Sequence, residues 1–77
     1  MSKFPRPTGK EFVRFLERQG FVCVRITGSH HYMEKGSLHS SVPVHSNDTL
    51  KMGTLRGILR SLKMKPEEFE SLWHGSM

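Results

Sequence analysis

Four of the five histidines lie close together in the middle of the chain, at His30, His31, His39 and His45. Histidine exchanges protons near neutral pH, and RNA carries its own nucleophile in the 2′-hydroxyl group. A base that removes the hydroxyl proton, together with a cation that stabilises the phosphoryl oxygens, is sufficient to cleave RNA. A thin domain without a deep pocket can perform this chemistry, although a single histidine in a protein is more often structural than catalytic.

Lysine and arginine residues are concentrated in the first 66 positions, where 12 of them stand against only four acidic residues. Two sets recur at the spacing of one helix face, namely Lys10, Arg14 and Arg18, and Arg56, Arg60 and Lys63. A solvated helix face would explain either set alone. Both sets together with Lys51 indicate a phosphate-binding surface, whose contacts give affinity without sequence choice and weaken with salt.

The size and composition of the chain exclude several classes of protein. The 77 residues fit at most one domain, and the net charge of +5 points to a polyanionic partner, nucleic acid before an anionic membrane. The lone Cys23 cannot form an internal disulfide, and no apolar run approaches the roughly 20 residues of a membrane span. No zinc-site spacing is present, so we expect no metal or other cofactor, and we expect a cytoplasmic location.

The candidate residues depend for their positions on the elements that carry them. A helix is predicted over about residues 9–19, because Thr8 and Glu11 have the capping-box spacing and apolar residues follow at i, i+3 and i+4. Gly20 suits the left-handed position beyond its end. The apolar stripe of a second long helix consists of Leu55, Ile58, Leu59 and Leu62.

Three strands are predicted between these helices, over residues 21–27, 30–34 and 40–44. In the first strand the apolar residues Val22, Val24 and Ile26 alternate. His30 and His31 begin the second strand after the Gly28-Ser29 turn and point to opposite faces of the sheet. Pro43 cannot donate to a ladder, so the third strand should lie at an edge or meet a bulge.

The remaining signals lie in the C-terminal third. Gly53 and Gly57 either weaken the second helix or allow the close approach of a strand or a ligand backbone. Pro66 suits the first position of a short last helix. The apolar residues of this helix could cap the core and are Phe69, Leu72 and Trp73.

The order of these elements, α-β-β-β-α(-α), predicts an α+β fold. We expect a three-stranded antiparallel sheet with both long helices on one face and the other face free, a layout similar to a double-stranded-RNA-binding domain. The predicted organisation is a flexible arm over residues 1–7, one domain over 8–73 and a tail over 74–77.

Several segments, taken in order, resemble the HicA toxins. These are Gly20-Phe21, Arg25, Gly28-Ser29-His30-His31, Val42-Pro43-Val44-His45 and the run Gly53 to Arg60, GTLRGILR. The similarity covers about residues 8–73. It implies an mRNA interferase of a type II toxin–antitoxin pair, a double-stranded-RNA-binding-like fold, and an antitoxin partner, HicB, that blocks the active site.

The resemblance implies the role of one residue, and our hypothesis from the sequence assigns the others. The catalytic histidine of the family's Gly-Ser-His motif corresponds to His30, and His45 is the candidate second proton carrier. Ser29 and the backbone at Gly28 would position the scissile phosphate. Further phosphate contacts are assigned to Arg25, Lys51, Arg56 and Arg60.

Two other functions fit the same residues. A non-catalytic module that binds structured RNA would use the same basic helix faces and would not cleave. A protein-interaction subunit would present its basic face to an acidic partner and ignore RNA at physiological salt. Binding to a membrane surface is disfavoured because neither helix has a large exposed aromatic face.

Overall fold

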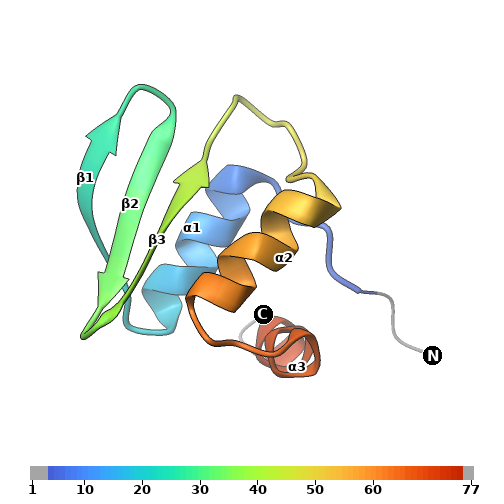
Figure 1. Cartoon of the computed structure of the whole chain (residues 1–77). Helices are drawn as coiled ribbons and strands as arrows, with labels where there is room; N and C mark the ends of the chain where they lie inside the picture. Colours follow the sequence, from blue (N-terminus) through green and yellow to red (C-terminus); the bar gives the residue numbers. More distant parts are fainter. Residues whose placement is uncertain (1–3, 76–77) are drawn as a thin grey trace.

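The computed structural model describes residues 4–75, which contain a three-stranded antiparallel sheet and three helices. Figure 1 shows them in chain order, and their bounds are α1 Gly9–Arg18, β1 Val22–Thr27, β2 His30–Lys35, β3 Leu38–Pro43, α2 Met52–Ser61 and α3 Pro66–Gly75. The fold class predicted from the sequence is confirmed. The third strand begins two residues earlier than predicted, because the tight turn at Gly36, with a φ of 62°, already pairs Leu38 with Lys35.

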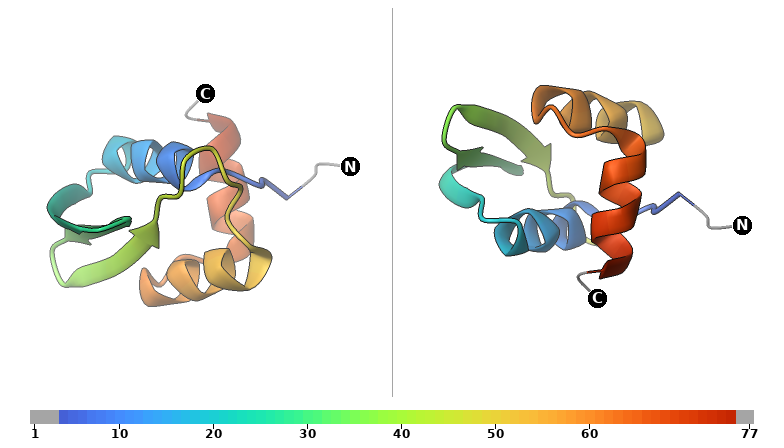
Figure 2. Two further views of the ribbon diagram at one scale, coloured as in Figure 1. Left: turned by 90° about the horizontal axis from the view of Figure 1, so that it is seen from above. Right: turned by 90° about the horizontal axis from the view of Figure 1, so that it is seen from below.

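The sheet carries its helices on one side only. Helices α1 and α2 lie side by side against the same face, α2 over β3, and the opposite face of the sheet is uncovered (Figures 1 and 2). Helix α3 crosses from α2 toward α1 (Figure 2). The strand order is β1-β2-β3, so Pro43 lies on an edge strand, as its missing N–H requires.

Helix α1 begins and ends where its sequence signals predict. The Thr8 hydroxyl accepts a hydrogen bond from the Glu11 N–H at 3.1 Å, and the Glu11 carboxylate accepts one from the Thr8 N–H at 2.9 Å. This reciprocal pair is the capping box. Beyond the helix, Gly20 has a φ of 97°, which a side chain would disfavour. Both signals fix the length of the helix that leads into β1.

The core is built around one aromatic side chain of the last helix. Phe69 is fully buried, and its ring lies 5.7 Å from the ring of Phe12 and 5.3 Å from that of Phe15, both edge-on. Phe4 packs on a third side at 5.6 Å. Trp73 lies 5.8 Å from Phe69. Helix α3 therefore closes the core, as its apolar spacing predicted, and it continues through Gly75 into the segment expected to be a tail.

The segment before α1 packs against the body of the domain rather than forming the expected arm. Pro5 and Pro7 are buried, and Phe4 contacts the core. The Pro7 carbonyl accepts a hydrogen bond from the Leu50 N–H at 2.9 Å. Buried apolar rings and this backbone bond hold residues 4–7 in place. Residues 1–3, the rest of that prediction, lie outside the described residues, as do residues 76–77.

Strand β1 contains an extra residue that its alternating sequence does not reveal. Cys23 pairs with Met33 and Arg25 with Tyr32, so Val24 forms a β-bulge between them. The bulge changes which face the following residues occupy. Val22, before the bulge, pairs with Glu34 on the uncovered face, whereas Ile26, after it, pairs with His31 on the helix-covered face. The exposed fractions are 62% for Val22, 52% for Val24 and 59% for Ile26.

The close approach of backbones occurs at Gly9, not at the two glycines of α2. A Cβ atom on Gly9 would overlap the carbonyl oxygen of Pro43 and lie 3.0 Å from the Cα of Val44. Cβ atoms on Gly53 and Gly57 would meet nothing within 4 Å. The start of α1 is therefore pressed against the end of β3, at the end of the sheet where the histidines lie.

We predict opposite effects of the same substitution at two helical glycines. Gly9→Ala should lower the free energy of unfolding by about 1–3 kcal/mol, because the methyl group collides with backbone atoms that cannot easily move. Gly57→Ala, the matched control, should raise it by up to about 1 kcal/mol through helix propensity. Urea unfolding followed by circular dichroism measures both. Equal effects of the two substitutions would contradict the close packing at Gly9.

Candidate functional site

The two adjacent histidines of β2 occupy different environments. His31 alternates with the fully buried Met33 and therefore lies on the helix-covered face of the sheet. His30 lies on the uncovered face, which it shares with Tyr32, and its side chain is exposed. The sequence predicted that the two would diverge. It did not decide which one faces the helices, although the apolar Met33 two places later was an available signal.

His31 is half-buried between two strand neighbours. It pairs with Ile26 on β1 and with Val42 on β3, and Val42 is fully buried. Helix α1 packs on this face of the sheet and begins at the same end, where Gly9 meets Pro43. The imidazole of His31 thus has apolar strand neighbours on both sides, on the sheet face that α1 covers.

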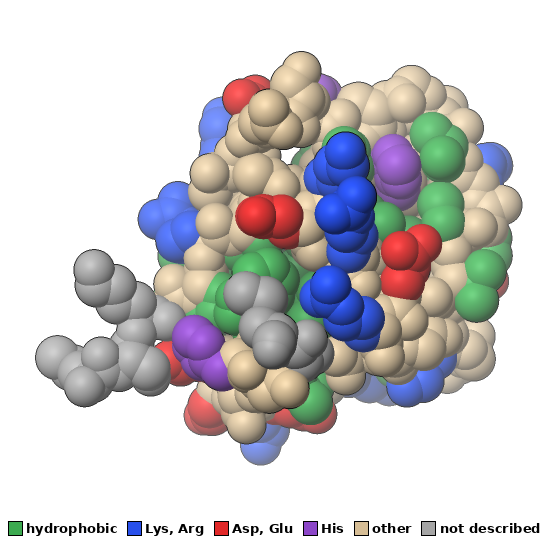
Figure 3. All heavy atoms as spheres, turned by 180° about the vertical axis from the view of Figure 1, so that it is seen from behind, with side chains coloured by type: hydrophobic (Ala, Val, Ile, Leu, Met, Phe, Trp, Pro, Cys, Tyr) green, Lys and Arg blue, Asp and Glu red, His purple; other side chains and the backbone are tan. Residues whose placement is uncertain are grey.

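Helix α1 presents a row of cations on its outer surface. Lys10, Arg14 and Arg18 are all exposed, at the spacing of one helix face. Figure 3 shows a column of Lys and Arg side chains with acidic side chains on both sides of it, a histidine side chain beside it and apolar side chains beyond. A polyanion bound along α1 would therefore reach the helix side of the sheet, where His31 lies, before the uncovered face.

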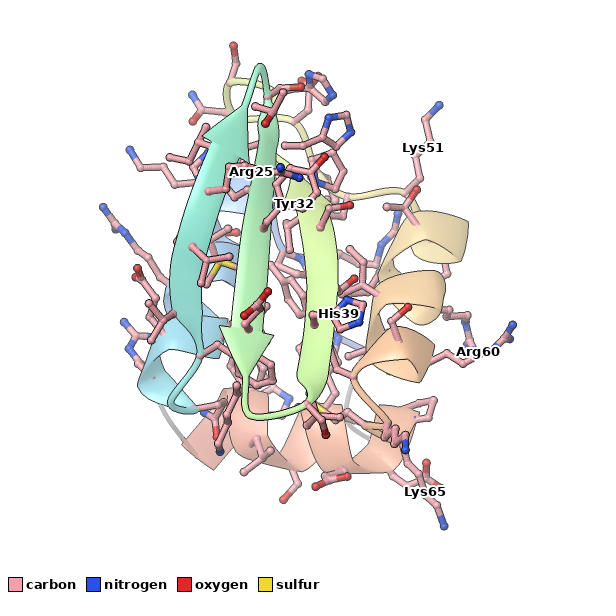
Figure 4. All side chains as sticks on the ribbon, turned by 60° about the vertical axis from the view of Figure 1, so that its left-hand side comes forward. Arg25, Tyr32, His39, Lys51, Arg60 and Lys65 are labelled. Atoms are coloured by element: carbon pink, nitrogen blue, oxygen red, sulfur yellow. The ribbon has the colours of Figure 1, made fainter. Side chains whose placement is uncertain are left out.

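The uncovered face of the sheet carries a stacked pair. The Arg25 guanidinium carbon lies 4.4 Å from the centre of the Tyr32 ring, a cation–π contact (Figure 4). Tyr32 is half-buried and Arg25 is exposed. His39 is also exposed on β3. Arg25, predicted to contact phosphate, thus lies on the same face as His30 and on the opposite face from His31.

The other predicted residues at this end of the sheet come from two loops. Gly28 turns the chain with a φ of 60°, and the Ser29 carbonyl accepts a hydrogen bond from the Val44 N–H at 2.7 Å. His45 therefore leaves the sheet beside the turn that precedes His30. It lines a hollow of about 330 Å³ together with Lys51 and Thr54 at the start of α2.

The predicted cations of α2 lie apart from the two histidines of β2. Arg56 and Arg60 are exposed, and the Arg56 guanidinium carbon lies 5.6 Å from the centre of the Phe4 ring. Figure 4 shows Lys51 and Arg60 on the outer side of α2, away from the sheet. The candidate residues are therefore divided among the uncovered face, the loop end and α2, and the sequence reasoning did not assign a role to His31.

Two classes of site are not found in the described part of the chain. Among residues 4–75 no group of three or more His, Cys, Asp and Glu side chains is placed to hold a metal ion. Within the same residues, no helix is long and apolar enough to cross a bilayer.

The family follows from a comparison with known proteins. The family model described as the HicA toxin of bacterial toxin–antitoxin systems matches residues 9–64, from the start of α1 through α2. The chain belongs to the HicA toxin family. The match includes both histidines of β2 and the cations of the α1 row, and it ends before α3. No curated protein matches this HicA chain.

Membership of this family establishes the chain as a toxin that works with an antitoxin. The family therefore implies two kinds of partner, a cellular target and an antitoxin. The HicA chain has both charged and apolar surfaces available, in the basic row of α1 and the exposed apolar side chains of β1.

Proposed function

We propose that this HicA toxin is an endoribonuclease that cleaves mRNA and thereby inhibits translation and growth. The observation that carries the proposal is the half-buried His31 on the sheet face that α1 covers, the same side of the sheet as the basic row Lys10, Arg14 and Arg18. Proton transfer and phosphate binding can meet there on one surface. The family match supports the same activity, because it places the chain among toxins.

The chemistry needs few groups. The cations of α1 bind the RNA backbone and place a 2′-hydroxyl near an imidazole. The neutral imidazole removes the hydroxyl proton, the 2′-oxygen attacks the adjacent phosphorus, and the 5′-oxygen leaves. Lys10 or Arg14 stabilises the charge that develops on the phosphoryl oxygens. A second proton carrier protonates the leaving oxygen, and His45 beside Lys51 is the candidate at the loop end.

The proton acceptor is one of the two histidines of β2. The sequence assigned this role to His30, which lies on the uncovered face with Arg25. The geometry favours His31, because its apolar neighbours restrict the ring and the α1 cations lie on its side of the sheet. Ser29 precedes the pair in the turn, and its role in positioning the phosphate is compatible with either histidine.

The partners follow from the same proposal. The substrate is single-stranded mRNA, which places the action of the toxin in the cytoplasm, and the antitoxin is HicB-like. A basic toxin surface attracts RNA by charge, and an antitoxin with an acidic surface would compete with the RNA for it. To neutralise the toxin, the antitoxin would then need only to cover His31 and the basic row of α1.

Cleavage by the purified toxin tests the proposal. Labelled single-stranded RNA is incubated with the protein in EDTA, beside a heat-denatured sample and a His30→Ala/His31→Ala double variant whose fold is checked by circular dichroism. We expect the native toxin alone to cut the RNA. If neither folded protein cuts and both retard RNA in a gel, the chain is a binding module. If both cut, the activity lies elsewhere.

We predict that Lys51→Ser separates stability from RNA binding. Lys51 is the N-cap residue of α2 and makes no side-chain capping hydrogen bond. A serine hydroxyl there should raise the free energy of unfolding by about 0.5–1 kcal/mol. The lost charge should weaken RNA binding and reduce the slope of log affinity against log salt by about 0.7, the value for one phosphate contact of a single strand.

Two measurements decide this prediction, thermal unfolding and fluorescence anisotropy with labelled RNA at several salt concentrations. Arg6→Ser, which also removes one exposed cation, is the control and should change neither stability nor the salt slope. An unchanged salt slope for Lys51→Ser would remove Lys51 from the RNA-binding surface, whatever happens to stability.

A further inference from the structure

A basic hollow opens where α2 ends and α3 begins. Its volume is about 400 Å³. Its floor is apolar, because Leu59 is buried and Met64 and Pro66 are half-buried. Its rim carries the exposed cations Arg56, Arg60, Lys63 and Lys65. We refer to these seven residues as the α2–α3 hollow.

The shape of the α2–α3 hollow depends on an unusual turn. Lys63 has a φ of 55°, a conformation that residues other than glycine rarely adopt. Two backbone hydrogen bonds fix it there, from the Lys63 N–H to the Arg60 carbonyl at 3.1 Å and from the Met64 N–H to the Leu59 carbonyl at 2.9 Å. The chain turns sharply at this point, which brings Lys65 and Pro66 to the side of α2.

The lining of the α2–α3 hollow is suited to nucleotides. Within the described residues it is formed by four cations and three apolar residues, and no carboxylate takes part. Proteins that bind single strands combine a positive groove for the backbone with apolar or planar surfaces for the bases. Arg56 and Arg60 are one helical turn apart and can contact successive phosphates, while Leu59, Met64 and Pro66 can contact a base or ribose.

The α2–α3 hollow lies at the opposite end of α2 from the loop that follows β3. Helix α2 has ten residues and is therefore about 15 Å long. Lys51 begins it at the histidine end of the sheet, and Figure 4 shows Lys51, Arg60 and Lys65 directed to the same side of the molecule. Cations therefore connect the loop end with the hollow along one edge.

We propose that the α2–α3 hollow binds single-stranded RNA several nucleotides away from the bond that is cleaved. This inference rests on the proposed function in taking RNA as the substrate. It adds that short RNA, which cannot span from the histidines to the hollow, binds more weakly and is cut less efficiently than long RNA. The hollow thus sets a minimum substrate length without touching the reacting atoms.

Binding measurements test this inference independently of catalysis. The protein is the His30→Ala/His31→Ala variant, which holds RNA without cutting it, and the probes are labelled RNAs of about 4 and about 16 nucleotides, the range of site sizes of small single-strand-binding folds. Arg60→Glu is expected to weaken the longer RNA about 10-fold and to leave the shorter one within about 2-fold. Arg6→Glu, an equal change of charge outside the hollow, should affect both lengths alike.

A second variant guards against loss of fold. Lys65→Ser removes a cation of the rim and supplies a hydroxyl at the residue before α3, where it can cap the helix, so the fold is retained. It should also weaken only the longer RNA. If Arg60→Glu and Lys65→Ser leave the preference for length unchanged, the inference is overturned. It is likewise overturned if both variants bind RNA normally and instead lose the antitoxin.

The result also distinguishes this inference from the proposed function. If the wild-type toxin does not cut RNA but the double-histidine variant prefers the longer RNA, the proposed nuclease activity is wrong and RNA binding by the α2–α3 hollow is supported. If the wild type cuts RNA and Arg60→Glu keeps the same ratio of cleavage rates on long and short RNA, the nuclease activity is supported and RNA binding by the α2–α3 hollow is wrong.

Discussion

Replacing His31 by alanine is expected to slow RNA cleavage by at least about 100-fold, the usual contribution of a general base. His30→Ala is expected to retain most of the wild-type rate. The two residues are neighbours of the same type, so the pair of variants is a matched comparison in which only the face of the sheet differs.

The physical reason lies in what each ring can reach. His31 is half-buried between Ile26 and Val42, on the face that α1 covers, and the exposed cations of α1 can hold a phosphate on that side. His30 is exposed on the other face, where Arg25 is the cation next to it across the sheet and is itself stacked on Tyr32. A base acts only within hydrogen-bonding reach of the hydroxyl, and loosely held rings meet that condition less often.

Initial rates on one labelled RNA in EDTA measure the difference, and circular dichroism confirms that each variant is folded. His31→Gln provides a second substitution that keeps a polar side chain of similar reach but cannot exchange the proton. A large loss in His30→Ala with a normal rate in His31→Ala would reverse the geometric preference and restore the assignment made from the sequence.

Replacing Phe69 by alanine is expected to lower the free energy of unfolding by about 3–5 kcal/mol. Phe69 is fully buried and contacts rings from the N-terminal segment, α1 and α3 itself, at Phe4, Phe12 and Trp73. A domain of this size has a total stability of only about 4–12 kcal/mol at typical values per residue. The cavity that Phe69→Ala leaves in the core would therefore remove a large fraction of the total free energy of unfolding.

Urea unfolding at 25 °C followed by circular dichroism measures this loss. Phe69→Leu, which keeps an apolar side chain in the cavity, should cost less than the alanine substitution. Leu72→Ala serves as the control on the same helix, because Leu72 is only half-buried. If Phe69→Ala costs no more than Leu72→Ala, α3 does not close the core, and the extent of the family match, which stops before α3, would define the stable unit.

Local signals in the sequence predicted most of the fold. The capping box at Thr8 and Glu11 and the left-handed Gly20 fix α1, and both are present in the structure. Pro43 excludes a central strand, and β3 is indeed at an edge. Such signals succeed because they depend on the backbone conformation of a few consecutive residues and need no knowledge of distant partners.

The features that could not be predicted depend on distant contacts. Gly9 looks like an ordinary helical glycine until β3 is placed against it, and Phe4 looks like part of a loose arm until Phe69 is seen beside it. The histidine pair shows the same limit. Because side chains alternate along a strand, His30 and His31 must lie on opposite faces of the sheet. Which of them lies on the helix-covered face is known only once the helices are placed against the sheet.

The β-bulge at Val24 has a consequence for how relatives of this toxin should be aligned. Cys23 and Arg25 pair with the consecutive residues Met33 and Tyr32. Removing Val24 would therefore leave a regular strand, and all the remaining side chains would stay on the faces that they now occupy. A gap at this position in an alignment therefore leaves the pairing of β1 with β2 unchanged, although the position lies inside a strand. Insertions and deletions during the evolution of the family should be tolerated there, whereas a gap one strand later would exchange the faces of the two histidines.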